Sequence, residues 1–274
     1  MSPASIPKRA VAAALVEEWD TLAGLLGELS ESEWLTPTAL PGWSVKDVAA
    51  HVVGTELTLI GQASPPLAEE VRAQPHVRNE IGAINEAWVE SFRTLSGSDV
   101  VDQLRSVTAR RRTELEAMTQ EAFDADSWTP AGPGSYGRFM QIRVYDCWIH
   151  EQDIRQALGR PGHQSGPCAE LSLDEVAGAL GYIVGKKAGA PSGASVTIEL
   201  DGPTRRSLHV SVDGRAAVVP SLAGPATAVV RMPFGLFMAM ASGRVPADPT
   251  AGEVAIEGDA ELGARVVSSL NFTI

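Results

Sequence analysis

The spacing of apolar residues predicts a helical first part of the chain. Apolar side chains from Val11 to Leu26 recur at intervals of three and four, which is the period of an amphipathic helix over residues 10–29. The same period predicts further helical stretches over residues 45–62, 77–95, 99–119 and 138–158. We expect the stretch over 99–119 to continue the preceding helix after a break at Gly97. Four main helices joined by short or medium loops predict a bundle.

Turns separate the predicted helices. The sequence Leu40-Pro41-Gly42-Trp43 predicts a turn, after which Ser44 is a suitable N-cap for the helix over 45–62. Asp47, three residues later, completes a weaker form of the capping box. Residues 129–134 contain two prolines and two glycines and predict a loop.

From residue 195 the period changes from helical to alternating. Strands are predicted where apolar and polar residues alternate, at 196–200 and at 208–212, before the hairpin dipeptide Asp213-Gly214. Further strands are predicted at 226–231 and 254–256, and helices at 174–188, 233–242 and 261–270. The chain therefore divides into a helical bundle over 1–160, a connector with a helix over 161–194, and a small α+β domain over 195–274.

Composition and charge narrow the function classes. The chain has 274 residues, of which 44% are hydrophobic, enough for sizeable cores. With 22 basic and 34 acidic residues the net charge is −12, which disfavours a nucleic-acid partner. No apolar run reaches the roughly 18 residues of a membrane span, and two cysteines make no disulfide framework. We expect a cytoplasmic protein without a membrane or nucleic-acid partner, as a monomer or a dimer.

The candidate chemistry lies on two of the predicted helices. His51 shares its side of the second helix with apolar residues, which by itself is typical of a hydrogen-bonded core histidine. On the helix over 138–158, Arg143, Asp146, His150 and Asp153 form one stripe of ionisable residues with isoleucines beside it. Such a stripe is compatible with simple Asp–His or Asp–Arg pairs. Two imidazoles and one carboxylate on facing helices would also make a three-ligand Zn²⁺-type site, with Asp153 orienting His150.

Other residues carry weaker signals. Trp43 is expected to pack at the start of its helix or to line the mouth of the site. His76, His163 and His209 have no ligand-like neighbours and are interpreted as surface or structural residues. Of the acidic residues, only Asp146 and Asp153 are expected to face inward. Met and Phe residues in the last domain suit either core packing or an apolar ligand: Met232, Phe234, Phe237, Met238 and Met240.

Two of these motifs carry a resemblance to a known family. The segment 40–45 with Asp47 and Ala50-His51-Val52, followed about a hundred residues later by the stripe from Arg143 to Asp153, resembles the mycothiol-dependent maleylpyruvate isomerases. The resemblance implies a DinB-like metal-binding four-helix bundle followed by a sterol-carrier-like α+β domain, in which Gly243-Arg244 and Gly258-Asp259 match the usual pattern.

The resemblance also implies the chemistry. His51, Asp146 and His150 would bind a divalent metal, usually zinc, although these isomerases commonly have Glu where this chain has Asp146. The metal would activate the thiol mycothiol for reversible addition to the cis double bond of a small-molecule substrate, with Arg244 or Arg143 holding its carboxylates. Two alternatives stay open: a mycothiol S-transferase acting on electrophiles, and a non-catalytic small-molecule-binding protein with the same bundle.

Overall fold

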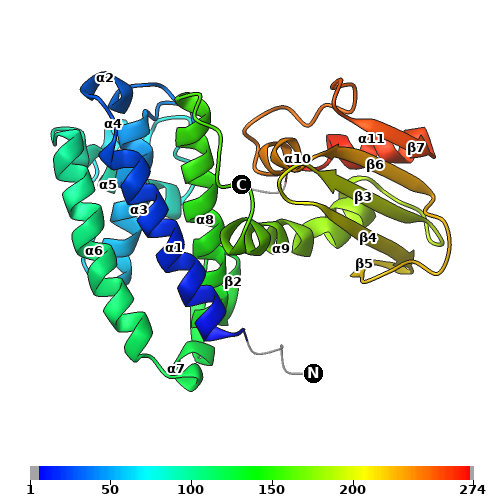
Figure 1. Ribbon diagram of the computed structural model, residues 1–274, viewed down its shortest axis with the longest axis horizontal. Coiled ribbons are helices and arrows are strands. Elements are labelled where there is room, and N and C mark those ends of the chain that lie inside the picture. The colour runs from blue at the N-terminus through cyan, green and yellow to red at the C-terminus, as the bar shows by residue number, and fades with distance from the viewer. Residues whose placement is uncertain (1–5, 272–274) are drawn as a thin grey trace. The chain divides into compact units, whose positions relative to one another are not determined.

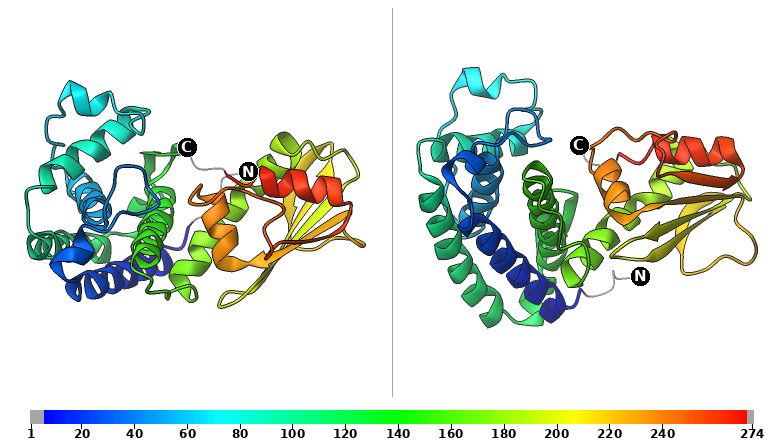
Figure 2. Two further views of the ribbon diagram at one scale, coloured as in Figure 1. Left: turned by 90° about the horizontal axis from the view of Figure 1, so that it is seen from above. Right: turned by 45° about the horizontal axis from the view of Figure 1, so that its top comes forward.

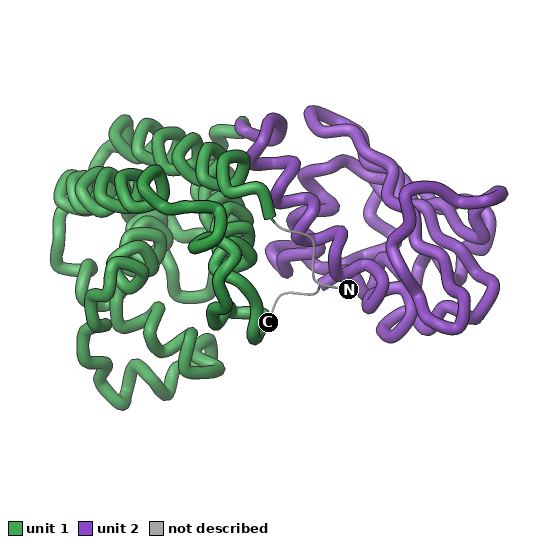
Figure 3. The backbone as a smooth tube through the Cα atoms, turned by 90° about the horizontal axis from the view of Figure 1, so that it is seen from below, with its two compact units in different colours: residues 1–162 green, residues 163–274 purple. Residues whose placement is uncertain are grey.

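The chain folds into two compact units. The computed structural model describes residues 6–271, and the chain divides into residues 1–162 and 163–274, which Figure 3 shows in two colours. The first unit is helical apart from one small hairpin, and the second is a sheet with helices (Figure 1). The predicted α+β fold class is confirmed. Among the described residues, no helix has both the length and the apolar character needed to span a membrane.

Four long helices make the body of the first unit. Helix α1 packs against α6 and α8, and α3 packs against α6, α8 and the shorter α5 (Figures 1 and 2). The long helices are α1 (Lys8–Gly27), α3 (Val45–Leu59), α6 (Gly97–Ala117) and α8 (Tyr136–Ala157). The shorter ones are α2 (Glu31–Trp34), α4 (Glu69–Arg72), α5 (Glu80–Phe92) and α7 (Gln120–Asp124). Helix α3 begins as predicted, because Ser44 and Asp47 form a reciprocal capping box.

Helices α5 and α6 correct one prediction. They are separate helices that pack against the same helix α3, and α6 does not continue α5. Gly97 is the first residue of α6 and is preceded by the N-cap Ser96, whose side chain accepts a hydrogen bond from the backbone of Asp99. A Cβ atom at Gly97 would lie 2.2 Å from Nε1 of Trp34, so the glycine permits close approach at a helix start.

The segment 129–134 corrects a second prediction. It belongs to an antiparallel hairpin of β1 (Asp126–Thr129) and β2 (Gly132–Ser135), in which Trp128 lies opposite Pro133. The Thr129 hydroxyl stabilises the turn, donating to the carbonyl of Gly132 at 2.7 Å and accepting from the amide of Ala131 at 3.1 Å. Proline and glycine therefore mark a hairpin end here.

The second unit contains a five-stranded sheet in the order β5-β4-β3-β6-β7. Strands β3 and β6 are parallel and the other neighbours are antiparallel. The strands are β3 (Ser195–Asp201), β4 (Arg206–Asp213), β5 (Arg215–Val219), β6 (Ala228–Pro233) and β7 (Ala255–Gly258). The helices are α9 (Pro167–Tyr182), which runs into the π-helical turn η1 (Ile183–Lys187), α10 (Phe234–Ala241) and α11 (Ala260–Ser268). Helix α9, from the segment expected to connect two domains, packs against β5 and β4.

Alternate residues of the central strands form the core of the second unit. In β6, Ala228, Val230 and Met232 are buried, while the residues between them are half-buried. The Met and Phe residues of α10 that had two interpretations are at most 1% exposed. They therefore form part of the packed core of this unit.

A glycine in the contact between α3 and α5 gives a stability test. A Cβ atom at Gly54 would lie 2.3 Å from Cγ of Trp88, so Gly54→Ala should lower the free energy of unfolding by about 1–3 kcal/mol through overpacking. Urea unfolding measures this change. The control is Gly24→Ala in α1, where nothing lies within 4 Å and the substitution should be neutral or stabilising. An equal response of both variants would contradict the proposed close contact.

Candidate metal centre

Two packed helices bring the three predicted ligands together. His51 lies in α3, and Asp146 and His150 lie one turn apart in α8. Candidate ligand atoms of the three side chains all lie within 4.8 Å of one another. The Nε2 atoms of both histidines lie 3.5 Å from the Asp146 carboxylate, one at each oxygen. The residues therefore face one common point.

His150 is oriented by a carboxylate behind it. Its Nδ1 lies 3.0 Å from Oδ2 of Asp153, one turn further along α8, as the sequence predicts for an orienting residue. Burial alone would lower the pKa of His150, but hydrogen bonds to Asp146 and Asp153 raise it above 6.5. With its Nδ1 hydrogen on the Asp153 side, the neutral ring presents the Nε2 lone pair toward Asp146.

His51 has a different environment. It is 4% exposed, and neither ring nitrogen has a hydrogen-bond partner among the described residues. Burial lowers the pKa of His51 below 6.5, against the opposing effect of Asp146, so the ring is neutral at pH 7. A buried imidazole without partners costs free energy. A cation bound between the two histidines would remove that cost, so the residues present fit a metal ion.

Asp146 is the most exposed of the three candidate ligands. Its side chain is 31% exposed, whereas those of His51 and His150 are 5% and 9% exposed. Burial opposes ionisation, but Arg143 and His51 hold the pKa of Asp146 well below its usual 3.8. The cluster therefore contains an ionised carboxylate beside a neutral imidazole, which suits a divalent cation.

The inward-facing acidic residues are more numerous than predicted. Asp153 is buried, and Asp146 is half-buried with its carboxylate facing the two histidines. Five further acidic residues are buried: Glu18, Asp47, Glu56, Glu86 and Glu151. Each buried carboxylate needs a compensating partner, and the partners of Glu56, Glu86 and Asp47 include residues that are remote in sequence.

Glu56 is a central residue that sequence reasoning missed. Its carboxylate is fully buried in α3 and pairs with Arg143 of α8 and Arg111 of α6, each at 2.9 Å. Arg111 also donates to the hydroxyl of Tyr136 at 2.9 Å. A charged residue inside the mostly apolar stretch 48–57 is the available signal, but its partners lie 55 and 87 residues away.

Arg143 is fully engaged within the protein. Its Nε and Nη2 donate to Glu56 and its Nη1 pairs with Asp146. Every nitrogen of this guanidinium therefore has a partner, which favours a role in positioning Asp146 over a role in binding a substrate carboxylate. Arg244, the other candidate, lies in the second unit just after α10 and donates to the carbonyl of Ser242 at 2.7 Å.

Trp43 lies against both histidines. The centroid of its indole is 5.4 Å from that of His51 and 6.3 Å from that of His150. Its Nε1 donates to Glu86 at 2.9 Å, and the same Glu86 oxygen lies 3.1 Å from Nε2 of His76. His76, interpreted from the sequence as surface or structural, thus has an acidic neighbour close to the site.

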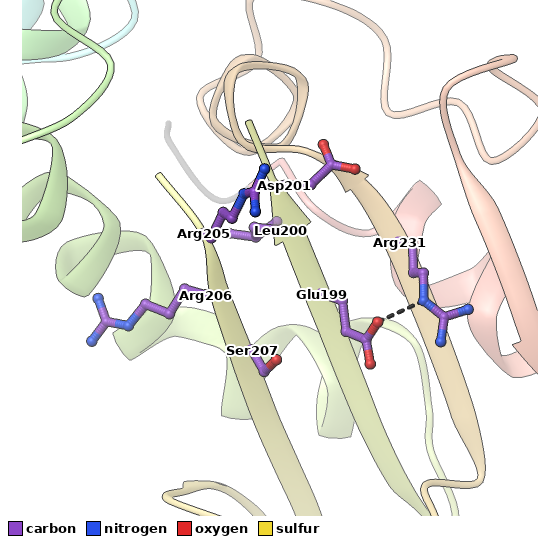
Figure 4. A pocket seen from close by; sticks show the side chains of 7 residues that line it. All are labelled: Glu199, Leu200, Asp201, Arg205, Arg206, Ser207 and Arg231. Atoms are coloured by element: carbon purple, nitrogen blue, oxygen red, sulfur yellow. Dashed lines mark hydrogen bonds and ion pairs between the residues drawn. The ribbon is translucent and has the colours of Figure 1, made fainter. Parts of the chain in front are cut away.

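A hollow of about 370 Å³ in the second unit is a weaker site candidate (Figure 4). Three arginines line it, but Arg231 pairs with Glu199 at 2.6 Å and Arg206 pairs with Asp174 at 2.6 Å. The arginine charges are thus largely compensated by carboxylates of the same unit. Such partly exposed pairs are typical of a solvated sheet surface.

The comparisons with known proteins assign the family. Residues 15–155 match the model of the mycothiol maleylpyruvate isomerase N-terminal domain, and residues 170–265 match that of the corresponding C-terminal domain. The chain belongs to this family. The first match covers α3 and α8 up to residue 155, and therefore all three candidate ligands.

Curated relatives and solved structures are also similar to this chain. Two uncharacterized proteins of Mycobacterium tuberculosis strains are 25% identical over 150 residues, a match that covers 54% of this chain and 56% of each of them. The chain thus matches little more than half the length of these curated relatives. Crystal structures of the mycothiol-dependent maleylpyruvate isomerase and of a histidine-to-alanine mutant share its fold. Each has a TM-score of 0.59 at 18% identity, over 92% of this chain and 93% of theirs.

The buried ion pairs behind the site predict a large stability effect. Glu56→Gln leaves two buried arginines without their shared carboxylate and should cost about 3–5 kcal/mol of unfolding free energy. Chemical denaturation measures the loss. Glu114→Gln removes another carboxylate from Arg111, but one that is 36% exposed, and should cost less than about 1 kcal/mol. Similar losses in both variants would contradict the central role of Glu56.

In metal-free protein, the pKa values of the two histidines should be shifted in opposite directions. The ring of His150 should titrate above pH 6.5 and that of His51 below it, as followed by NMR of the ring protons. His150 then adds stability that is complete below pH 6.5 and is lost as the pH rises through its folded-state pKa. His51 has the opposite effect, because stability falls as the pH drops below 6.5. The reverse order of midpoints would contradict the assigned environments.

Proposed function

We propose that the protein is a metal-dependent enzyme that uses the low-molecular-weight thiol mycothiol to isomerise maleylpyruvate or a closely similar substrate. The observation that carries the proposal is the convergence of His51, Asp146 and His150 from two packed helices. Membership of the mycothiol maleylpyruvate isomerase family supports the reaction type.

The donor set suits a divalent cation such as Zn²⁺. Two imidazoles and one carboxylate provide three ligands and leave a fourth tetrahedral position open for a small molecule. A metal ion held there would stabilise the thiolate form of a thiol at neutral pH. Asp153 fixes the tautomer of His150, and Arg143 keeps Asp146 ionised and directed toward the histidines.

The proposed reaction is a reversible addition. The sulfur of the thiolate forms a bond to one carbon of the cis double bond. The π electron pair of the double bond moves toward the neighbouring carbonyl. Rotation about the resulting single bond and loss of the thiolate then give the trans isomer, fumarylpyruvate. The guanidinium fork of Arg244 is the candidate for binding a substrate carboxylate, because Arg143 is occupied by Glu56 and Asp146.

Metal content tests the ligand assignment. Elemental analysis should find close to one zinc or similar ion per chain in the purified protein. The variants His51→Ala and His150→Ala should each lose it, since each removes one of three ligands. The control is His209→Ala in β4, whose ring contacts Thr197 at 3.0 Å and which should retain the metal. Full metal retention in both ligand variants would refute the assignment.

Turnover tests the reaction. Metal-loaded protein with mycothiol should convert maleylpyruvate to fumarylpyruvate, as followed by NMR of the vinyl protons, and omission of the thiol should stop the conversion. Stable attachment of the thiol to an electrophile without isomerisation would instead assign a transferase. The absence of thiol-dependent turnover with any electrophile would favour a binding protein.

A further inference from the structure

A buried carboxylate joins three parts of the first unit beside the metal ligands. The side chain of Glu86, in α5, is 1% exposed although this helix supplies none of the three ligands. Its Oε2 accepts a hydrogen bond from Trp43 Nε1 at 2.9 Å and lies 3.1 Å from Nε2 of His76. Its Oε1 lies 3.4 Å from Nη2 of Arg93. Burying a carboxylate costs free energy unless hydrogen bonds compensate it. The groups that bond to Glu86 therefore indicate which parts of the structure it holds in place.

The main partner is Trp43, which is held both at its backbone and at its indole. The backbone carbonyl of Trp43 accepts hydrogen bonds from the amide and the hydroxyl of Thr38 at 3.0 and 2.9 Å. The side chain is held by Glu86. Between these two anchors the ring lies tilted by 37° against His51 and by 40° against His150. The indole therefore has a defined orientation over the two imidazoles.

Arg93 connects the same carboxylate to the start of the ligand-bearing helix. Its Nε lies 3.2 Å from Oδ1 of Asp47, the residue whose other oxygen accepts from the backbone of Ser44 in the capping box of α3. Arg93 also contacts the carbonyl of Gly42, next to Trp43, at 3.4 Å. Glu86 and Arg93 thus tie α5 to the loop of Trp43 and to the first turn of the helix that carries His51.

We propose that Glu86 is a positioning residue of the site, whose buried carboxylate fixes the indole of Trp43 across the rings of His51 and His150. The indole shields the imidazoles from water, and the apolar surroundings of a metal site tune its affinity. The inference deepens the proposed function and rests on it for the identity of the metal ligands. Its structural part, the orientation of Trp43 by Glu86, is measurable without a metal.

The first test uses NMR of metal-free protein. Glu86→Gln should move the indole N–H resonance of Trp43 and, because the ring current of the indole changes, the ring resonances of His51 and His150. Trp43→Phe should also move both histidine signals. The control is Glu90→Gln, which removes a carboxylate from the same helix and the same Arg93 but lies outside the hydrogen bonds of Trp43. Unchanged indole and histidine signals in Glu86→Gln would overturn the positioning role of Glu86, and unchanged histidine signals in Trp43→Phe would overturn the contact of the indole with the two rings.

The second test measures the affinity for Co²⁺ by its visible absorbance. Glu86→Gln and Trp43→Phe should each weaken binding about 10-fold relative to the wild type, whereas Glu90→Gln should not. Equal affinity in all four proteins would overturn the shielding role of Trp43. If Glu86→Gln fails to fold, as judged by near-ultraviolet circular dichroism, Glu86→Asp, which keeps the charge but shortens the reach to Trp43, decides both tests. Absence of Co²⁺ binding by the wild type would refute the proposed function, and NMR would then decide the positioning role alone.

Discussion

Charge balance around Glu56 constrains the whole first unit. One buried carboxylate from α3 pairs with a buried arginine from α6 and another from α8, so three of the four long helices meet at a single ionic contact. Two positive charges exceed one negative charge by one, and each arginine also has a second carboxylate as partner. Glu114 serves Arg111, and Asp146 serves Arg143. The carboxylate of the candidate metal centre is thus part of the ionic core of the bundle.

The two histidines obtain different properties from their surroundings. His150 lies between two carboxylates, which raise its pKa, whereas burial lowers the pKa of His51 against the opposing effect of Asp146. Environments that separate the pKa values of neighbouring titratable groups are common at functional sites. Here the separation arises from helix geometry, because Asp146, His150 and Asp153 lie on one face of α8 while His51 approaches from α3.

The sequence predicts those features that depend on neighbours along the chain. The helix periods, the capping box at Ser44 and Asp47, and the stripe from Arg143 to Asp153 all follow from spacing within one element. Membership of the family was also correctly identified from the two motifs. The roles of Glu56 and Glu86 are not predicted, because their partners lie on other parts of the chain. A glutamate in the sequence does not by itself show whether its carboxylate is buried or exposed.

The two errors in secondary structure have a similar origin. A glycine such as Gly97 is typical of a break within a helix. Here a side chain at this position would clash with the indole of Trp34, which only tertiary packing brings near. The prolines and glycines of 129–134 are typical of a loop, but the two short strands that flank Pro130 need only a few backbone hydrogen bonds to pair.

The division into two compact units has a consequence for cooperativity. Each unit buries its own apolar core, and a chain of two such units lies outside the class of small single domains for which one two-state free energy of unfolding is well defined. The candidate ligands all belong to the first unit. A bound metal would therefore stabilise the folded state of that unit through mass action.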